Sequence, residues 1–467
     1  MLNPGQFERR VSSLGMVALV GAFVFFGVLT YWQVFRTDLA GEDSNPRVLR
    51  EFQDPNRGRI LDRDGNVLAE SLPDGTRRYT DASVAHAVGY IDPRYGSQGA
   101  ELAFNGQLSG QQAASWEGAF NAEFRRDANR GLDVRLTLDP ELQAAAAEAL
   151  GSRTGAVIAL DPKTGQVLAM VSVPTYDPGS LGDSGEALLN DPASPLLNRA
   201  TQGLYPPGST FKTVTASSAL EHGVITPDTT VTCPGEIVID GFPISCNNVA
   251  QGTGTYPFRN AFAFSVNAIF AQVGVDLGWE NLLDTAQRFG FGSELPFTLA
   301  TARTQVFNPG SDLTKTALAS TAFGQGELLA TPLQMAVVAS TVANGGVLAQ
   351  PHLGLAAYDG DKRVEDLEDH GTRRILDPEV ANEVRDMMVA VVDNGQALGA
   401  QIPGVKVAGK TGTAESGVQG QSHAWFIAFA PAEDPVIALA VVVENGGRGG
   451  EVASPIAGEI LRAALGK

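Results

Sequence analysis

A serine and a lysine three residues apart are the first candidates for chemistry in this chain. They lie in Tyr205-Pro206-Pro207-Gly208-Ser209-Thr210-Phe211-Lys212, and residues 213–221 that follow contain no helix breaker. The prolines and Gly208 prevent a helix before Ser209, so we expect a helix to start there, with Ser209 and Lys212 on one face. A serine hydroxyl needs a base to take its proton, and a lysine in an apolar site can be neutral enough to do so. The same spacing is common in a helix cap beside a solvated lysine, so it does not establish catalysis by itself.

Two further groups of polar residues follow along the chain. Ser265 and Asn267 lie in Phe264-Ser265-Val266-Asn267-Ala268, and a spacing of two suits a short turn between helices better than one helical face. The group Lys410-Thr411-Gly412-Thr413 ends a predicted strand, which would place a cation and hydroxyls on a sheet edge where Gly412 lets a substrate backbone lie close. Either group alone is weak evidence, because such residues usually satisfy local backbone groups.

Residues 404–411 also match the pattern of a phosphate-binding loop, Gly-x-x-x-x-Gly-Lys-Thr. That loop requires a strand before its first glycine and a helix after its Lys-Thr pair. Here Val405 and Val407 alternate as in a strand inside the supposed loop, and residues 412–417 are poor helix formers. We therefore interpret the match as chance.

The elements that must position these groups are predicted from the periodicity of the apolar residues. Asp139 and Pro140 suit the N-cap and first position of a helix that runs to residue 150. Predicted strands cover residues 132–137, 155–160, 166–171, 405–411, 424–430 and 436–443, a final amphipathic helix covers 451–465, and the region from the first motif to about residue 400 is predicted to be mostly α-helical. A tight turn at 161–165 makes 155–171 an antiparallel hairpin. A sheet built from both ends of a domain, with helices inserted between, is an α+β arrangement.

Composition excludes some classes of function. The 467 residues carry a formal net charge of -19 and show no basic patch, which argues against a nucleic-acid partner. The five histidines lack metal-ligand spacing, so no metal or cofactor is expected. The two cysteines, Cys233 and Cys246, could form a disulfide in an oxidising compartment or could be two buried free thiols.

Residues 14–34 carry no charge and are about long enough to span a bilayer as one helix. Arg9 and Arg10 precede this run and an acidic segment, 38–43, follows it, which predicts an uncleaved anchor with everything downstream outside the cytoplasm. Residues 37–130 are irregular and rich in turn formers, and Asp64-Gly65 predicts a β-hairpin.

Taken together and in this order, Ser209-x-x-Lys212, Ser265-x-Asn267 and Lys410-Thr411-Gly412 form the signature of active-serine penicillin-recognising enzymes. The chain resembles the class B penicillin-binding proteins, which are membrane-anchored transpeptidases of peptidoglycan synthesis. Further matching segments are Arg57 to Leu68, Gly324-Gln325-Gly326, His423-Ala424-Trp425-Phe426 and Glu444-Asn445-Gly446-Gly447. The resemblance implies a leader and single-pass anchor at 1–36, a mostly-β pedestal or interaction module at 37–130 and a monofunctional transpeptidase domain at 131–467, whose antiparallel sheet is flanked by helices.

The resemblance also implies a role for each polar group in acyl transfer. Ser209 would attack the carbonyl between two D-alanines at the end of a stem peptide and form an acyl-enzyme, with Lys212 as the base. Ser265 would relay the proton to the leaving amine, and Asn267 would hold the substrate amide. A neighbouring stem peptide would then supply the amine that resolves the ester, and β-lactams would trap Ser209.

The third motif is implied to bind the substrate. Lys410 would attract the terminal carboxylate and bias Lys212 toward its neutral form, while Thr411 and Thr413 would bind that carboxylate beside Gly412. Backbone N–H groups of Ser209 and Thr413 would form the oxyanion hole.

Other functions share these motifs. A D,D-carboxypeptidase or β-lactamase would use water as the acceptor, and a non-catalytic β-lactam sensor or scaffold would need no acceptor. The expected partners are peptidoglycan stem peptides, β-lactams and the cytoplasmic membrane. Residues 1–130 would contact a membrane glycosyltransferase or proteins of cell division or elongation.

Overall fold

The structure is a computed structural model that describes residues 54–110, 130–246, 252–369, 371–417 and 419–467. The membrane anchor predicted at residues 14–34 and the basic leader before it lie outside these ranges. Within them, no helix is both long and apolar enough to cross a bilayer.

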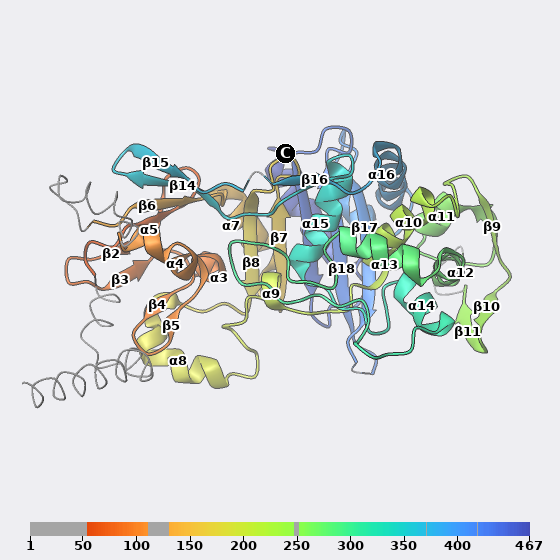
Figure 1. The fold of residues 1–467 in the computed structure, drawn as a ribbon, viewed down its shortest axis with the longest axis horizontal. Coiled ribbons are helices and arrows are strands. Elements are labelled where there is room, and N and C mark those ends of the chain that lie inside the picture. Colours follow the sequence, from red (N-terminus) through yellow and green to blue (C-terminus); the bar gives the residue numbers. More distant parts are fainter. Residues whose placement is uncertain (1–53, 111–129, 247–251, 370, 418) are drawn as a thin grey trace, which may run out of the picture.

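A five-stranded antiparallel sheet forms the centre of the molecule (Figure 1). Its order is β17 (Ala408–Glu415), β18 (Ser422–Ala430), β19 (Ile437–Val443), β7 (Gly155–Leu160) and β8 (Val167–Val173). The predicted assembly from both ends of the domain, including the β7–β8 hairpin, is confirmed. Strands β7 and β19 are buried along their whole length, which explains their unbroken apolar sequence.

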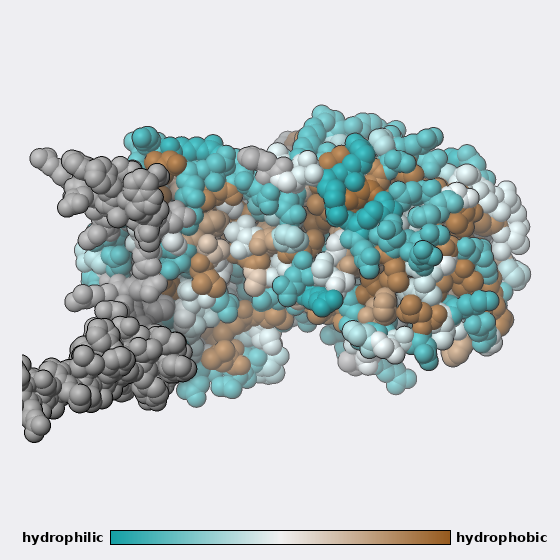
Figure 2. Space-filling model, viewed as in Figure 1, coloured by the Kyte–Doolittle hydropathy of each residue, from teal (hydrophilic) through white to brown (hydrophobic). Residues whose placement is uncertain are grey.

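Helices pack against this sheet. α7 (Pro140–Leu150) and the C-terminal α17 (Ala453–Ala464) pack on each other and on the sheet, and α15 (Pro332–Ala343) contacts β19 and β7. The Asp139 side chain accepts hydrogen bonds from the backbone N–H groups of Glu141 and Leu142, so the predicted N-cap is confirmed. The sheet and these helices hold most of the apolar core, while exposed large apolar side chains are scattered among hydrophilic surface (Figure 2).

A second group of helices lies beside the edge strand β17. It comprises α10 (Lys212–Glu221), α11 (Phe258–Ala263), α12 (Asn267–Leu277), α13 (Trp279–Arg288), α14 (Lys315–Ala322) and α16 (Pro378–Asp393). All residues of α10 from Lys212 to Leu220 are buried, and α10 contacts α12, α13 and α16. This helix therefore runs through the interior of the molecule.

The prediction of a mostly helical region up to about residue 400 is wrong in part, because several strand pairs interrupt it. They are β9 (Thr230–Cys233) with β12 (Gly254–Pro257), β10 (Glu236–Ile239) with β11 (Phe242–Ser245), and β13 (Val347–Ala349) with β16 (Thr372–Arg374). The β10–β11 turn uses Asp240 and Gly241 at φ of 48° and 86°, a hairpin signal that the sequence analysis missed.

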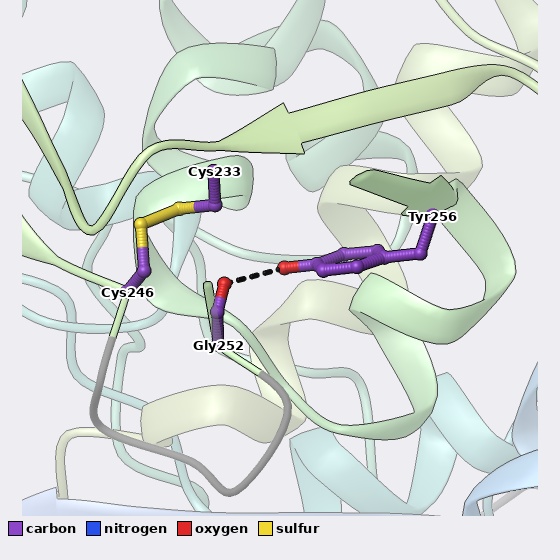
Figure 3. Close-up of a disulfide and its surroundings, with 4 residues drawn as sticks. All are labelled: Cys233, Cys246, Gly252 and Tyr256. Carbon is purple, nitrogen blue, oxygen red and sulfur yellow. Dashed lines mark hydrogen bonds between the residues drawn. A yellow bond between two sulfur atoms is a disulfide. The ribbon is translucent and has the colours of Figure 1, made fainter. Parts of the chain in front are cut away.

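Cys233 and Cys246 form a disulfide at the base of this hairpin, with 6.1 Å between their Cα atoms (Figure 3). This resolves the alternative left open by the sequence. Beside it, the Tyr256 hydroxyl donates to the backbone oxygen of Gly252 at 2.8 Å.

A six-stranded sheet forms the other end of the molecule, at the left of Figure 1. Its order is β15 (Lys362–Asp366), β14 (Gly354–Asp359), β6 (Asp133–Leu136), β1 (Ile60–Leu61), β2 (Val67–Ser71) and β3 (Arg77–Tyr79). The predicted hairpin at Asp64-Gly65 is confirmed by the antiparallel β1–β2 pair. Strands β14 and β15 join this sheet from the last third of the chain, which local sequence patterns did not indicate.

Short elements of the described chain include α3 (Ala85–Val88), β4 (Ile91–Asp92), β5 (Gly96–Ser97), α4 (Gly99–Ala103), α5 (Asn105–Leu108), α8 (Leu181–Asn190) and α9 (Arg199–Gln202), and the 3-10 turns Ala82–Val84, Pro178–Ser180 and Leu398–Ala400.

Candidate active site

Ser209 lies in a tight turn, Gly208–Phe211, that leads directly into α10 at Lys212. This agrees with the prediction of a helix start. Gly208 has a φ of 55°, and its N–H donates to the backbone oxygen of Gly324 at 2.9 Å. A Cβ on Gly324 would lie 1.7 Å from the Gly208 oxygen, so the close contact of these two backbones requires glycine. The turn that carries Ser209 is thereby fixed in place.

Two lysines, each with no exposed surface, lie on either side of Ser265. Lys212 Nζ is 2.8 Å from the backbone oxygen of Ser265, 3.1 Å from Ser265 Oγ and 2.7 Å from Asn267 Oδ1. Lys410 Nζ donates to Ser265 Oγ at 2.9 Å and to Thr411 O at 3.1 Å. The three sequence motifs therefore meet at one hydroxyl group.

No carboxylate balances these lysines among the ion pairs found in the described residues. Phenyl rings lie near instead, with Phe270 5.2 Å from Lys212 Nζ and Phe262 5.7 Å from Lys410 Nζ. Burial, and then the charge of Lys410, hold the pKa of Lys212 well below its ordinary value. Burial lowers the pKa of Lys410 to about 7.

The hydrogen-bond partners of Lys212 fit a neutral amine. The backbone oxygen of Ser265 and the amide oxygen of Asn267 can only accept, so they take two hydrogens from Lys212 Nζ. A neutral amine has two hydrogens and one lone pair, and the lone pair then faces the hydroxyl of Ser265, the third partner, at 3.1 Å. Lys212 can thus accept a proton from a serine.

Ser265 lies in the turn between α11 and α12, as its spacing from Asn267 predicted. It adopts a φ of 62°, a left-handed conformation that costs about 1–2 kcal/mol in a residue with a Cβ. Backbone bonds from Ser265 N to Phe262 O and from Val266 N to Ala261 O hold the turn. The strain is tolerated where Ser265 contacts both lysines.

Strand β17 forms one wall of the site and is the edge strand of the central sheet, as predicted. Side chains alternate across a strand, so Thr411, Thr413 and Glu415 share the face that lines the cleft. The predicted bounds 405–411 are wrong at both ends, because the strand begins at Ala408 and pairing with β18 continues it to Glu415.

The backbone of β17 also turns polar groups toward the cleft. A residue in an antiparallel strand directs its N–H and C=O to the same side. The Thr413 oxygen faces Gln325, whose Nε2 lies 3.5 Å away, and the Thr411 oxygen faces Lys410. The N–H of Thr413 therefore points away from β18, toward the free edge of the sheet.

Gly412 faces the protein interior. A Cβ there would lie 2.8 Å from the Pro207 oxygen and 2.9 Å from Trp425 Cβ. Its lack of a side chain lets the turn before Ser209 pack against β17, a packing role that the sequence analysis did not anticipate.

A cleft of about 630 Å³ opens above these groups. Its lining includes Ser209, Ser265, Asn267, Thr411 and Thr413. Lys212 and Lys410 lie buried beneath it. The lining also contains residues without a role assigned from the sequence, namely Phe323, Gln325, Gly395, Gln396, Leu398, Gly399, Glu415, Arg448, Gly450 and Glu451. Only Gln325 had a sequence signal, as part of Gly324-Gln325-Gly326.

Comparison with known proteins identifies this arrangement. Residues 155–462 match the penicillin binding protein transpeptidase domain, and residues 57–134 match the penicillin binding protein A dimerisation domain. The peptidoglycan D,D-transpeptidase PbpA of Mycolicibacterium smegmatis is 36% identical, and the alignment covers 98% of each chain. The peptidoglycan D,D-transpeptidase MrdA of Acinetobacter baumannii is 31% identical over 85% of this chain and 62% of that protein.

A solved structure shares the fold. Penicillin-binding protein A from M. tuberculosis, as its ceftriaxone acyl-enzyme complex, matches with a TM-score of 0.81 and 35% identity, covering 89% of this chain and 100% of that chain. The family match, the sequence identity and the convergence of three motifs on one cleft show that this chain belongs to the penicillin-binding protein transpeptidase family.

Proposed function

We propose that this protein is a serine-type peptidoglycan D,D-transpeptidase and a target of β-lactams. The observation that carries the proposal is a pair of buried lysines that both contact the Ser265 hydroxyl, beneath a cleft that Ser209 lines. Relatives named peptidoglycan D,D-transpeptidase and a relative solved as a β-lactam acyl-enzyme support it.

Acylation begins with attack of Ser209 Oγ on the carbonyl carbon between the two terminal D-alanines of a stem peptide. Lys212 takes the hydroxyl proton on the lone pair of its neutral amine, which faces the Ser265 hydroxyl before substrate binds. The C–N bond breaks, and the proton reaches the departing D-alanine amine through Ser265, which contacts Lys212. The product is an ester on Ser209.

Substrate binding uses the other groups of the cleft. Lys410, with Thr411 and Thr413, attracts the terminal carboxylate, and Asn267 holds the amide of the preceding residue. The N–H groups of Ser209 and Thr413 stabilise the developing oxyanion by roughly 3 kcal/mol per donor. An amine of a second stem peptide then attacks the ester, forms the cross-link and releases Ser209.

Labelling and cross-linking together test the proposal. Purified protein is incubated with a fluorescent penicillin, and separately with a D-Ala-D-Ala donor and an amine acceptor. We expect label on Ser209 and a cross-linked product, both lost in Ser209→Ala. Ser217→Ala is the matched control, because Ser217 lies on the same helix and its hydroxyl donates to Thr213 O. Labelling with only hydrolysed donor would contradict transpeptidation and favour a carboxypeptidase.

We further propose the domain order 1–36, 37–130 and 131–467, with a single-pass anchor at residues 14–34 and the catalytic domain outside the cytoplasm. The uncharged run supports an anchor, and the Cys233–Cys246 disulfide suits an oxidising compartment. Protease added to intact spheroplasts should remove residues 131–467. Protection of that region until lysis would contradict the orientation.

We also propose that residues 1–130 contact a membrane glycosyltransferase or proteins of division or elongation. The match of residues 57–134 to a dimerisation domain supports an interaction role for this region. A photo-crosslinker at Leu102, which is 56% exposed on α4, should capture such a protein in cells. Cross-links confined to copies of this chain would contradict a partner of that kind.

A further inference from the structure

We propose that Gln396 is a positioning residue that holds the hydrogen of the Thr411 hydroxyl, for which the ligand carboxylate must compete, and so sets the preference of the cleft for ligands that carry a carboxylate. The inference rests on the proposed function, in which Thr411 binds that carboxylate. Gln396 belongs to none of the three sequence motifs, and it lines the cleft.

The backbone around Gln396 is tightly held. Gln396 follows α16, and a Cβ on the preceding Gly395 would lie 2.5 Å from Ala263 O. On the other side, a Cβ on Gly450 would lie 2.1 Å from Gln396 O. These contacts leave little room for the loop to shift, so the side chain leaves a fixed point on the cleft wall.

The side-chain amide has a defined orientation. Gln396 Nε2 donates to the backbone oxygen of Phe264 at 2.9 Å, and Gln396 Oε1 accepts from Thr411 Oγ1 at 3.2 Å. A backbone oxygen can only accept, so the amide nitrogen must face Phe264 and the amide oxygen must face Thr411. Gln396 therefore connects the turn of Ser265 with strand β17.

This orientation determines what Thr411 can offer a ligand. A threonine hydroxyl has one hydrogen, and here that hydrogen is given to Gln396. A carboxylate can only accept, so it binds Thr411 by drawing this hydrogen away from the Gln396 amide. The new hydrogen bond is charge-assisted and is therefore stronger than the bond to the neutral amide that it replaces. Gln396 therefore competes with the carboxylate for this hydrogen, and the strength of its hold sets how strongly Thr411 favours a ligand that carries a carboxylate.

The test separates this role from a structural one. The second-order rate constants for acylation by benzylpenicillin and by its methyl ester are measured in competition with a fluorescent penicillin. The quantity of interest is the acid-to-ester ratio in wild type, Gln396→Met, Thr411→Val and the double variant. Gln401→Met is the matched control, because Gln401 donates to Val392 O and Asp393 O at the end of the same helix.

We expect Gln396→Met to raise the ratio, by up to about fivefold, because the carboxylate no longer has to displace a hydrogen bond from Thr411. Because Gln396 acts only through Thr411, the double variant should have the same ratio as Thr411→Val. Gln396→Glu should lower the ratio, since its charge repels the ligand carboxylate and holds the Thr411 hydrogen more tightly. Gln401→Met should keep the wild-type ratio.

An unchanged acid-to-ester ratio in Gln396→Met and Gln396→Glu, with both rate constants falling equally, would overturn the proposal and leave Gln396 a structural residue, and so would a lower ratio in Gln396→Met. Multiplying effects in the double variant would overturn it as well. Failure of the wild type to label at Ser209 would instead remove the proposed function, and this inference with it.

Discussion

Two places in the described part of this molecule bury a pair of cationic side chains, and they differ in what lies between the cations. In the N-terminal sheet region, Arg57 and Arg77 lie on either side of Glu101, with Nε to carboxylate distances of 2.9 and 2.7 Å. Beneath the cleft, Lys212 and Lys410 lie on either side of Ser265, which is neutral. Glu101 and both lysines have no exposed surface, so the two places are similarly buried. Only the first of them pairs its cations with a negative charge.

The type of cation accounts for the difference. A guanidinium does not lose its proton in proteins, so two buried arginines need a carboxylate. Burial lowers the pKa of a lysine, so a buried lysine can become neutral. This is what burial does to Lys212 and Lys410. The first site is built to stay charged and hold the fold together, whereas the second yields an amine that can accept a proton.

Exchanging the type of cation at the catalytic site should have the largest effect. Lys212→Met removes the base and should slow acylation by roughly 100- to 10,000-fold. Lys212→Arg should be as slow, and it should also lower the free energy of unfolding by about 3 kcal/mol or more, since its buried charge has no partner. Stopped-flow acylation by penicillin and urea unfolding measure the two effects. An active Lys212→Arg variant would contradict a neutral base.

Removing the carboxylate from the N-terminal pair should have the next largest effect. Glu101→Gln leaves two buried guanidinium groups without a counter-charge and should cost about 3–5 kcal/mol of unfolding free energy. Glu70→Gln is the matched control, because Glu70 pairs with Arg78 at the surface, where Arg78 is 58% exposed, and should cost under about 1 kcal/mol. Equal losses in the two variants would show that Glu101 is not the counter-charge described here.

The smallest effect should appear in the pH dependence of stability. Lys410 has a folded pKa of about 7 against an ordinary value of 10.5, so between these values the unfolded chain binds a proton that the folded chain does not. The free energy of unfolding should therefore rise with pH, by up to about 1.4 kcal/mol per pH unit for this lysine. The contribution is fully present above pH 10.5 and lost as the pH falls through 7.

The slope is obtained from the free energy of unfolding measured between pH 8 and 9.5, and it is compared between the wild type and its variants. Lys410→Met should have a smaller slope than wild type, and Glu101→Gln should keep the wild-type slope. The same slope in Lys410→Met and wild type would mean that Lys410 is not neutralised by folding.

The local part of the site could be predicted from the sequence. Ser209 and Lys212 follow from a helix start after two prolines, and the turn at Ser265 follows from its spacing to Asn267. The contacts between motifs were not available from local patterns, because Ser265 is 53 residues from Lys212 and 145 from Lys410. The resemblance to a family brought these residues together and implied a neutral Lys212, but it did not give the distances between them.

Tertiary pairing explains the remaining differences. Residues 412–415 have weak strand propensity, yet β17 extends through them because each pairs with β18. Strands β14 and β15 belong to a sheet whose first strand, β1, lies about 300 residues earlier in the chain. The pairing of Ala357 on β14 with Val134 on β6 is one of these long-range contacts. Gln396 lies in a loop after α16, where a glutamine carries no periodic signal.

The central claim is that Lys212 is neutral in the resting enzyme, and the pH dependence of acylation tests it most directly. The second-order rate constant for acylation by benzylpenicillin reports the free enzyme. We expect it not to climb toward pH 10, and to fall above about pH 7, where Lys410 loses the charge that attracts the ligand carboxylate. A rate constant that climbs about tenfold per pH unit above pH 7, toward the ordinary lysine pKa of 10.5, would contradict the account.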